Sequence, residues 1–438
     1  MGHRYGHLWG EITSFANLLL AFRKARLGKR RKATVAAFEY RLEENLFQLQ
    51  EELRGGAYRP GPYSNFTIHE PKRRLISAAP FRDRVVHHAL CNVIEPLFER
   101  QFIYDSYANR VGKGTHRALD RCTEFMRRFA YVLPMDVRQF FPSIDHAILL
   151  ETLGRTIGDA RTLDLVAKII AGGAGVQADE YDMVYFPGDD LFAVNRPRGL
   201  PIGNLTSQFW ANVYLNGLDH FIKRQLRCRG YVRYVDDLLL FADDKAALHA
   251  WRSEVIARLA ALRLTIHENS AQPRPTRCGV PFLGFQVFPD HRRLKRRNAV
   301  QARRRLRALR DAFHRGEISR ERVDAGVQGW INHARYGDTW GLRRAVLADI
   351  VLRGEGDGER SRGRRQPEQE PPRQSQRQHR LPVCPIALPG SMGPGRNVAG
   401  LRPVWAADRR RAPGGRAPAV PVWPHVSPLT PEHVRPGQ

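Results

Sequence analysis

Apolar residues recur at helical spacing along much of the chain. Positions three and four residues apart in FANLLLAF and FEYRLEENLFQLQEEL predict helices between residues 10 and 55, with the basic stretch ARLGKRRK between them. Three later segments have the same spacing and are also predicted to be helical: FRDRVVHHALCNVIEPLFER, HAILLETLGRTI and SQFWANVYLNGLDHFIKRQL. From Arg292 to about Leu352 the pattern is again helical and rich in arginine.

Strand-like patterns separate these helices. NFTIHEPKRRLISAAP has the alternation of an extended segment that ends at Pro80, and YVLPMDVRQFFPSI has the pattern of a buried strand with an acid at its end. In YVRYVDDLLLFADD, strand-forming residues flank two adjacent acids, Asp236 and Asp237, which are therefore predicted to lie at a hairpin turn. An ordinary surface turn of the Asx type is the alternative for this segment taken alone.

The charge of the chain is strongly positive. Its 71 lysines and arginines exceed its 44 aspartates and glutamates, giving a formal net charge of +27 over 438 residues. Such an excess indicates a polyanionic partner, with nucleic acid as the leading candidate, because Lys and Arg neutralise phosphates on binding. A basic surface that only aids solubility is the alternative. The length is sufficient for a large core and two or three domains.

Other features concern the compartment and the last part of the chain. The five cysteines are scattered, without a C-x-x-C pair or ligand-like spacing with histidine, which favours a reduced, cytoplasmic chain without a zinc site. The polar N-terminus lacks the apolar run of a signal peptide, and no stretch approaches a membrane span. Residues 353–438 are rich in Pro, Gly, Arg and Gln and lack apolar periodicity, so they are predicted to be disordered.

A third acid precedes the hairpin by one hundred residues. Asp136 ends the predicted strand in LPMDVRQFFPSID, and separate strands can bring it beside Asp236. Three carboxylates at adjacent strand ends offer the oxygen ligands that Mg²⁺ prefers, with waters and substrate phosphates as its other ligands. Two such ions about 3.5–4 Å apart can stabilise the attacking and the leaving oxygen of a phosphoryl transfer. The acids therefore predict a metal-dependent phosphoryl-transfer site.

The order and separation of these motifs resemble those of the reverse transcriptases, with Asp136 in the first metal motif and YVDD in the second. The resemblance extends over about residues 65–350. It implies an α+β right-hand polymerase with fingers, palm and a short helical thumb, which copies a template RNA into cDNA from a primer and dNTPs. The residues implied in catalysis are Asp136, Asp236 and Asp237, and those implied in holding two Mg²⁺ ions are the same three with Val137.

The resemblance also implies how the chain divides and where the nucleotide binds. The expected divisions are 1–115 for N-terminal helices and fingers, 116–290 for the palm with interleaved fingers elements, 291–352 for the thumb and 353–438 for the tail. Lys72 and Arg74, which alternate onto one face of the fingers strand, are expected to meet the triphosphate. Phe140 is expected to lie beneath the incoming sugar, with simple core packing as the alternative.

Further positions are implied in binding the nascent base pair and the nucleic acid. In the loop before the predicted helix SQFWANVYL, Gly203 permits close backbone approach to a base pair, and Ile202 is expected to contact the nucleotide with it. The positions expected to contact template or primer are Arg110, Ser207, Gln208, Leu283 and Gly284. A solvated charge remains the alternative for Arg110, and a plain core hairpin for VPFLGFQVF, which contains the last two.

The same loop favours one branch of the family. Where group II intron and retron enzymes usually have Q-G-x-x-x-S-P, this chain has IGNLTSQ, residues 202–208, which is similar to the diversity-generating retroelement branch. That resemblance implies a prokaryotic or phage-encoded enzyme, a small helical accessory protein, and cDNA that is error-prone at template adenines. The alternatives are a group II intron-like or defence-associated reverse transcriptase, and a catalytically idle RNA-binding protein.

Overall fold

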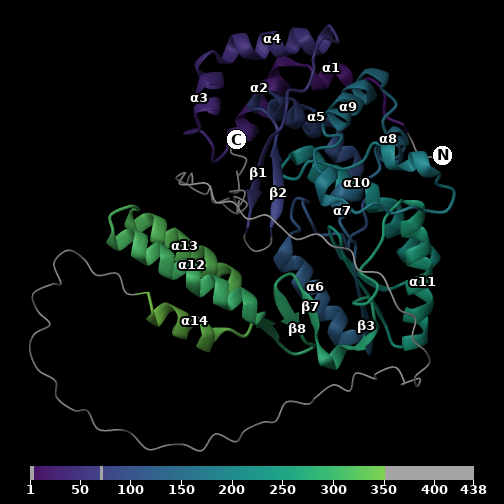
Figure 1. Ribbon diagram of the computed structural model, residues 1–438, viewed down its shortest axis with the longest axis vertical. Helices are drawn as coiled ribbons and strands as arrows, with labels where there is room; N and C mark the ends of the chain where they lie inside the picture. The colour runs from purple at the N-terminus through teal and green to yellow at the C-terminus, as the bar shows by residue number, and fades with distance from the viewer. Residues whose placement is uncertain (1–3, 70–72, 351–438) are drawn as a thin grey trace, which may run out of the picture. The chain divides into compact units, whose positions relative to one another are not determined.

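The computed structural model describes residues 4–69 and 73–350, and Figure 1 traces their path. The predicted mixture of helices and strands is confirmed. The predicted disorder of residues 353–438 and the position of Lys72 both concern residues outside these ranges. None of the helices in the described part of the chain is long and apolar enough to cross a membrane.

The first described elements are helical, as their apolar spacing predicts. They are α1 (Trp9–Ile12), α2 (Phe15–Ala25), α3 (Ala33–Tyr40) and α4 (Leu42–Arg54). Ser14 caps α2, because its side chain accepts a hydrogen bond from the backbone N–H of Asn17. Helix α2 packs along α5 (Phe81–Glu99), and apolar residues from both enter the main hydrophobic core.

The extended segment predicted before Pro80 forms a two-stranded antiparallel sheet. Strands β1 (Ser64–Ile68) and β2 (Arg74–Ala78) pair in register, with Ser64 opposite Ala78 and Ile68 opposite Arg74. Pro80 follows as the N-cap residue of α5. Strand β2 is therefore joined by a very short connection to a helix of the core.

A central sheet holds the acids that the sequence singles out. Its strands, in the antiparallel order β4-β5-β3-β6, are β3 (Tyr131–Asp136), β4 (Gly230–Tyr234), β5 (Asp237–Ala242) and β6 (Arg274–Pro275). The strand predicted in YVLPMDVRQFFPSI ends at Asp136, as predicted. The residues after it form a short helix, α7 (Phe140–Ser143).

Strand β3 contains a proline, Pro134, between two neighbouring strands. The Val137 N–H donates to the Asp236 carbonyl at 3.2 Å, and bonded and non-bonded pairs alternate along antiparallel strands. Pro134, opposite Leu239, therefore occupies a non-bonded position whose nitrogen points away from β5. On that side β6 pairs only with the first two residues of β3, so the proline interrupts no ladder.

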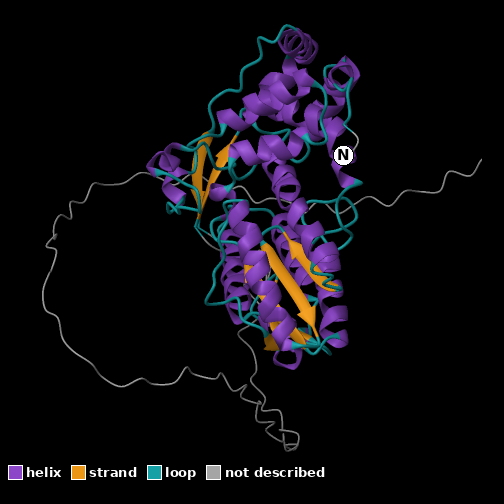
Figure 2. Ribbon diagram, turned by 90° about the vertical axis from the view of Figure 1, so that its right-hand side faces the viewer, coloured by secondary structure: helices purple, strands orange, loops and turns teal. Residues whose placement is uncertain are grey.

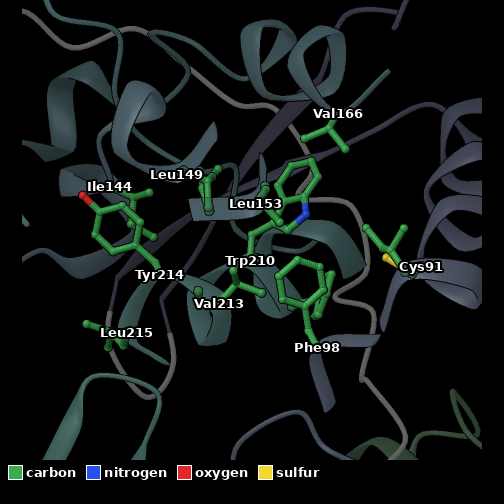
Figure 3. Packing of buried hydrophobic residues seen from close by; sticks show 14 of the residues in the cluster. Cys91, Phe98, Ile144, Leu149, Leu153, Val166, Trp210, Val213, Tyr214 and Leu215 are labelled. Carbon is green, nitrogen blue, oxygen red and sulfur yellow. The ribbon is translucent and has the colours of Figure 1, made fainter. Parts of the chain in front are cut away.

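Helices surround the strands, and Figure 2 shows how much of the chain they form. Helices α6 (Thr115–Arg128) and α11 (Lys245–Ala261) contact the central sheet, α10 (Leu205–His220) packs against α11 and α8 (His146–Gly154), and α9 (Ala160–Gly172) packs against α8. Figure 3 shows the centre of the packing, where Trp210 of α10 lies among Phe98, Leu153 and Val166 from three other helices. Helix α10 is therefore the element around which this part of the core is built.

A third sheet and three helices complete the described chain. The elements are β7 (Val280–Phe282), β8 (Phe285–Val287), β9 (Arg292–Leu294), α12 (Arg296–His314), α13 (Arg320–Ala334) and α14 (Trp340–Ala348). The helical prediction from Arg292 is wrong at its start, because β9 pairs with β8 and sets Leu294 opposite Phe285. Arg292 also donates to Asp120 and Thr123 of α6, a long-range contact that helical spacing does not reveal.

One buried histidine makes the stability of the fold dependent on pH. His87 of α5 is buried, and neither ring nitrogen has a hydrogen-bond partner in the described ranges. Burial lowers the pKa of His87 to about 3, and the nearby charges of His88 and Arg84 act in the same direction. The unfolded chain, with a histidine pKa of about 6.5, takes up the proton first. Stability is therefore lost as the pH falls from about 6.5 toward 3.

We expect His87 alone to remove about 2 kcal/mol of unfolding free energy between pH 7.5 and pH 5, because each pH unit inside this window costs about 1.4 kcal/mol. The variant His87→Leu, which cannot take up a proton, should lose correspondingly less over the same interval. Urea unfolding of both proteins at the two pH values measures the difference. The same loss in both would contradict the assignment.

Candidate active site

The adjacent acids lie at the connection between β4 and β5. Tyr234 pairs with Asp237, so the turn consists of Val235 and Asp236, and Asp237 is the first residue of β5. The predicted hairpin is confirmed, although only one of its two acids lies in the turn itself. Val235 has a φ of 56°, and holding a β-branched residue in this region costs on the order of 1–3 kcal/mol. Such strain persists only where surrounding contacts hold the turn.

Strand β3 brings Asp136 to the same end of the sheet. Asp136 lies opposite Asp237, and the Val137 N–H bonds to the Asp236 carbonyl. By the alternation of bonded positions, Asp136 and Asp237 form a non-hydrogen-bonded pair, in which the Cα atoms are only about 4.5 Å apart and the side chains share one face. All three acids are partly exposed. The strand register thus brings together acids that lie one hundred residues apart in the sequence.

The donor set suits a hard cation. Within residues 4–69 and 73–350, no three or more His, Cys, Asp or Glu side chains are grouped so that they could hold a metal ion. Asp136 and Asp237 still fit Mg²⁺, because this ion uses one or two carboxylates and takes waters and substrate phosphates as its remaining ligands. Val137 has a buried apolar side chain, so only its backbone could contribute.

The loop before α10 is attached to β2. The Ser77 N–H donates to the Ile202 carbonyl at 2.9 Å, and Asn204 Nδ2 donates to the Ser77 carbonyl at 2.8 Å. Gly203 between them has a φ of 110°, and a Cβ there would lie 2.9 Å from Ile76 Cγ2. Only glycine fits both requirements. Ile202 and Gly203 are partly exposed, and the two hydrogen bonds join their loop to β2; we call these two joined segments the wall.

Phe140 is part of the hydrophobic core. Its side chain is buried and meets the ring of Phe141 edge-on at a centroid distance of 5.6 Å. The preceding residue, Gln139, has a φ of 46°, which turns the chain sharply after β3 into α7. This burial agrees with the core-packing interpretation of Phe140, and contact with a sugar stays a prediction.

Two of the predicted cationic contacts differ in their surroundings. Arg74 is exposed at the start of β2, where its side chain is accessible to a ligand. Arg110 has a side chain only 6 % exposed, and it bonds to the Glu99 carboxylate and to the carbonyls of Ile103 and Ser106. The guanidinium of Arg110 therefore bonds to partners inside the fold. Both expectations for this residue, a contact with template or primer and a solvated charge, disagree with this position.

The other predicted nucleic-acid contacts lie in α10 and at the β7–β8 turn. Gln208 is exposed on the first turns of α10, whereas Ser207 is buried. Leu283 and Gly284 form the turn, with φ values of 45° and 89°. Asn298 of α12 donates to the Gly284 carbonyl at 3.2 Å, so this turn is attached to the helix that follows the third sheet.

A buried ion pair beneath the acid-bearing turn is absent from the sequence predictions. Arg233 of β4 is completely buried, and its Nε and Nη2 donate to the two carboxylate oxygens of Asp219 at 2.7 and 2.6 Å. Burial acts to lower the pKa of Arg233, but the attraction of Asp219 outweighs it and the pKa is raised. A signal was available, because an arginine inside the apolar strand YVRYV requires a buried partner.

Comparisons with known proteins show what the chain is similar to. The family model described as "Reverse transcriptase (RNA-dependent DNA polymerase)" matches residues 68–287. The chain is 26% identical over 290 residues to Protein YkfC of Escherichia coli (strain K12), covering 57% of this chain and 72% of that protein. It is 25% identical over 183 residues to the group II intron-encoded protein LtrA of Lactococcus lactis subsp. cremoris, covering 41% of this chain but only 28% of that protein. An uncharacterized 91 kDa protein in the cob intron of Schizosaccharomyces pombe is 31% identical over 153 residues, which are 35% of this chain and 17% of the relative.

The close approach at Gly203 gives a direct test of the wall between the loop and β2. Gly203→Ala should lower the unfolding free energy by about 1–3 kcal/mol, because the new methyl group meets Ile76 and the φ of 110° is strained for alanine. The matched control is Gly217→Ala, on the exposed side of α10 with open space around it, which should stabilise by up to about 1 kcal/mol. Urea unfolding of both variants measures the contrast, and similar values would disprove the packing of the loop.

Proposed function

The chain belongs to the reverse transcriptase family, and from this premise we propose that it extends a primer on an RNA template and makes cDNA from dNTPs. The observation that carries the proposal is the register of β3 and β5, with Asp136 opposite Asp237 and Asp236 in the adjoining turn. The net charge of +27 supports RNA and DNA as partners, since basic side chains neutralise their phosphates.

The proposed role of the three acids is to hold two Mg²⁺ ions. When bound, these ions supply positive charge at the attacking and the leaving oxygen of the transferred phosphoryl group. Asp136 and Asp237 are suited to this role because strand pairing fixes their backbones opposite each other. The protein also contributes the strained turn at Val235, which determines where Asp236 stands.

The wall formed by β2 and the loop before α10 is the proposed place of the incoming nucleotide. Arg74, with Lys72 preceding it in the sequence, would neutralise the triphosphate. The partly exposed backbone of Gly203 is proposed to lie against the base pair, while the space that a Cβ would need is occupied by Ile76. Ile202 adds an apolar surface, and Phe140 would support the sugar from within the core.

The right-hand divisions and the nucleic-acid contacts are part of the same proposal. Residues 1–115 would form the N-terminal helices and fingers, 116–290 the palm and 291–352 the thumb. Helix α12 supports a role in binding the phosphate backbone, because exposed arginines such as Arg304 and Arg305 lie along it. Gln208 and the Leu283–Gly284 turn are proposed to contact template or primer.

Within the family we propose the diversity-generating branch, in which template adenines are copied with errors and a small accessory protein takes part. The support is the sequence IGNLTSQ, which lacks the glutamine of many relatives at Ile202. The names of LtrA and the Schizosaccharomyces pombe relative favour a second candidate, a group II intron-type enzyme. The two candidates differ in the errors they would make at adenine.

The catalytic proposal predicts that Asp136→Asn and Asp237→Asn each reduce nucleotide incorporation by more than about 100-fold, since even changes to outer-shell partners of metal ligands cost about 10- to 100-fold. The measurement is primer extension on RNA with Mg²⁺. Binding of the primed RNA should persist, because asparagine preserves the shape.

Asp244→Asn is the matched control. Asp244 lies beyond the far end of β5 and caps α11, a position that asparagine also fills well. This variant should extend primers at the wild-type rate. Substantial nucleotide incorporation by Asp136→Asn or Asp237→Asn would show that the substituted acid does not belong to the proposed site.

The branch proposal predicts that wild-type cDNA contains more errors opposite adenine than opposite other bases. An apolar side chain at position 202 offers no directional hydrogen bond, and shape alone separates similar substrates by only about 1–3 kcal/mol. Ile202→Gln should therefore reduce these errors by about tenfold or more. Copying an RNA of known sequence and sequencing the cDNA gives the rates, with the accessory protein added where one is needed.

Ile202→Val retains a β-branched apolar side chain and should keep the wild-type error spectrum. Errors evenly spread over the four template bases in wild type would contradict the branch and leave the intron-type candidate. Equal adenine errors in wild type and Ile202→Gln would instead remove only the role of Ile202.

A further inference from the structure

The buried Arg233 makes a contact that bears directly on the candidate active site. Its Nη1 donates to the Val235 carbonyl at 3.1 Å and to Asn212 Oδ1 at 3.1 Å. The Val235 carbonyl belongs to the peptide that joins Val235 to Asp236, inside the strained turn. The guanidinium is therefore hydrogen-bonded to the peptide group that directly precedes the Cα atom of Asp236.

The guanidinium is itself fixed by other groups. Its two hydrogen bonds to Asp219 use the planar fork of arginine, which sets the orientation of the group as well as its position. Asp219 also accepts a hydrogen bond from the Tyr231 hydroxyl at 2.8 Å, and Asn212 Nδ2 donates to the Ala108 carbonyl at 2.8 Å. Each group that aims Arg233 is therefore held by a further contact.

The backbone of Arg233 is held as well. Its N–H donates to the Asp105 carbonyl at 2.9 Å, and its carbonyl accepts from the Tyr107 N–H at 3.0 Å. These bonds lie on the side of β4 that faces away from β5, where they replace a neighbouring strand. The residue therefore has little freedom to move relative to the sheet.

The same network joins the turn to the loop at the start of α10. Asn212 and Asp219 both lie on α10, which begins at Leu205, directly after the loop that is bonded to Ser77. Helix α10 is thus attached to the Gly203 loop at its first residue, and further along it supplies Asn212 and Asp219, which orient Arg233. The acid-bearing turn and the proposed nucleotide wall share one rigid support.

Stability alone does not account for a charged pair at this place. Apolar side chains of similar volume usually stabilise a core as well as a buried ion pair does. An apolar residue at position 233, however, cannot donate to the Val235 carbonyl, and a lysine cannot do so while also bridging both oxygens of Asp219. The arginine supplies a hydrogen-bond geometry that other side chains lack.

We propose that Arg233 is a positioning residue for nucleotidyl transfer, which sets the orientation of the Val235–Asp236 peptide while Asp219 and Asn212 aim its guanidinium. This role rests on the proposed function of the acids as metal ligands. Arg233 itself does not touch the reacting atoms. Its contribution is to keep Asp236 where a divalent cation and the substrate phosphates require it.

The test compares wild type, Arg233→Lys and the control Arg26→Lys, whose arginine pairs with Glu39 among the N-terminal helices. Thermal unfolding reports the fold, and EPR of free Mn²⁺ reports metal binding without any reaction. Primer extension on RNA gives kcat and the KM for dNTP. Arg233→Lys should stay folded, bind Mn²⁺ about 10-fold more weakly and lose about 100-fold in kcat, with KM unchanged. Arg26→Lys should match wild type.

A second variant protects the test against misfolding. Asn212→Ala removes one acceptor of the guanidinium but leaves its ion pair intact, so no buried charge loses its partner. It should shift Mn²⁺ binding and kcat in the same direction as Arg233→Lys, by a smaller factor. If Arg233→Lys does not fold, wild-type Mn²⁺ affinity in Asn212→Ala overturns the proposal.

The remaining outcomes separate the two proposals. Wild-type Mn²⁺ affinity in folded Arg233→Lys, or a loss of kcat that only follows the loss of folded protein, would reduce Arg233 to a structural residue. A wild-type protein that incorporates no nucleotide on primed RNA would refute the proposed polymerase function instead. In that case the Mn²⁺ affinities of the variants still decide whether Arg233 positions the acids.

Discussion

The antiparallel register between β3 and β5 is the constraint on which the candidate site depends. A slip of one residue would turn every side chain of β3 to the opposite face, so Asp136 and Asp237 would no longer face each other. The slip is opposed because alternate residues of the two strands pack into two separate hydrophobic clusters, with Leu133, Met135, Leu238 and Leu240 in one and Val132, Leu239 and Phe241 in the other. The hydrophobic core therefore aligns the acids, and the acids themselves need contribute nothing to the alignment.

The region around the acids contains two features that oppose folding. Val235 adopts a backbone conformation that its branched side chain disfavours, and Arg233 and Asp219 leave water completely. Both are supported by α10, which supplies Asp219 and Asn212 and whose apolar residues pack in the core around Trp210. The strained turn and the buried charges therefore rest on a helix that is anchored in the hydrophobic core.

The local patterns of the sequence were sufficient to predict most elements but not their long-range contacts. The helices α2, α4, α5, α8 and α10, both strands of the acid hairpin and the acid at the end of β3 follow from apolar spacing and strand-forming residues. Helices α6, α9 and α11 are not among the predicted helices, although the buried positions of α6, such as Leu119, Cys122 and Met126, have helical spacing.

The missed features depend on tertiary contacts. Strand β9 is held by its pairing with β8 and by the contact of Arg292 with α6. Neither contact is visible in the local sequence, which is rich in arginine and by itself suggests a helix. The burial of Arg110 likewise depends on Glu99 and two carbonyls in a neighbouring loop. Asp219 and Asn212 have no local pattern that marks them, since their meaning comes from the arginine of a strand that follows α10.

Pro134 has a consequence for how this protein behaves at high concentration. A strand edge with free N–H groups is a template on which an extended segment of another molecule can pair. On the side of β3 that faces away from β5, β6 pairs with the first two residues, and beyond Pro134 the His267 N–H donates to the Asp136 carbonyl and the Arg138 N–H to the Thr265 carbonyl. Pro134 lies between these two covered stretches, and its nitrogen carries no hydrogen. The uncovered part of this side of β3 therefore presents no N–H group to an intruding strand.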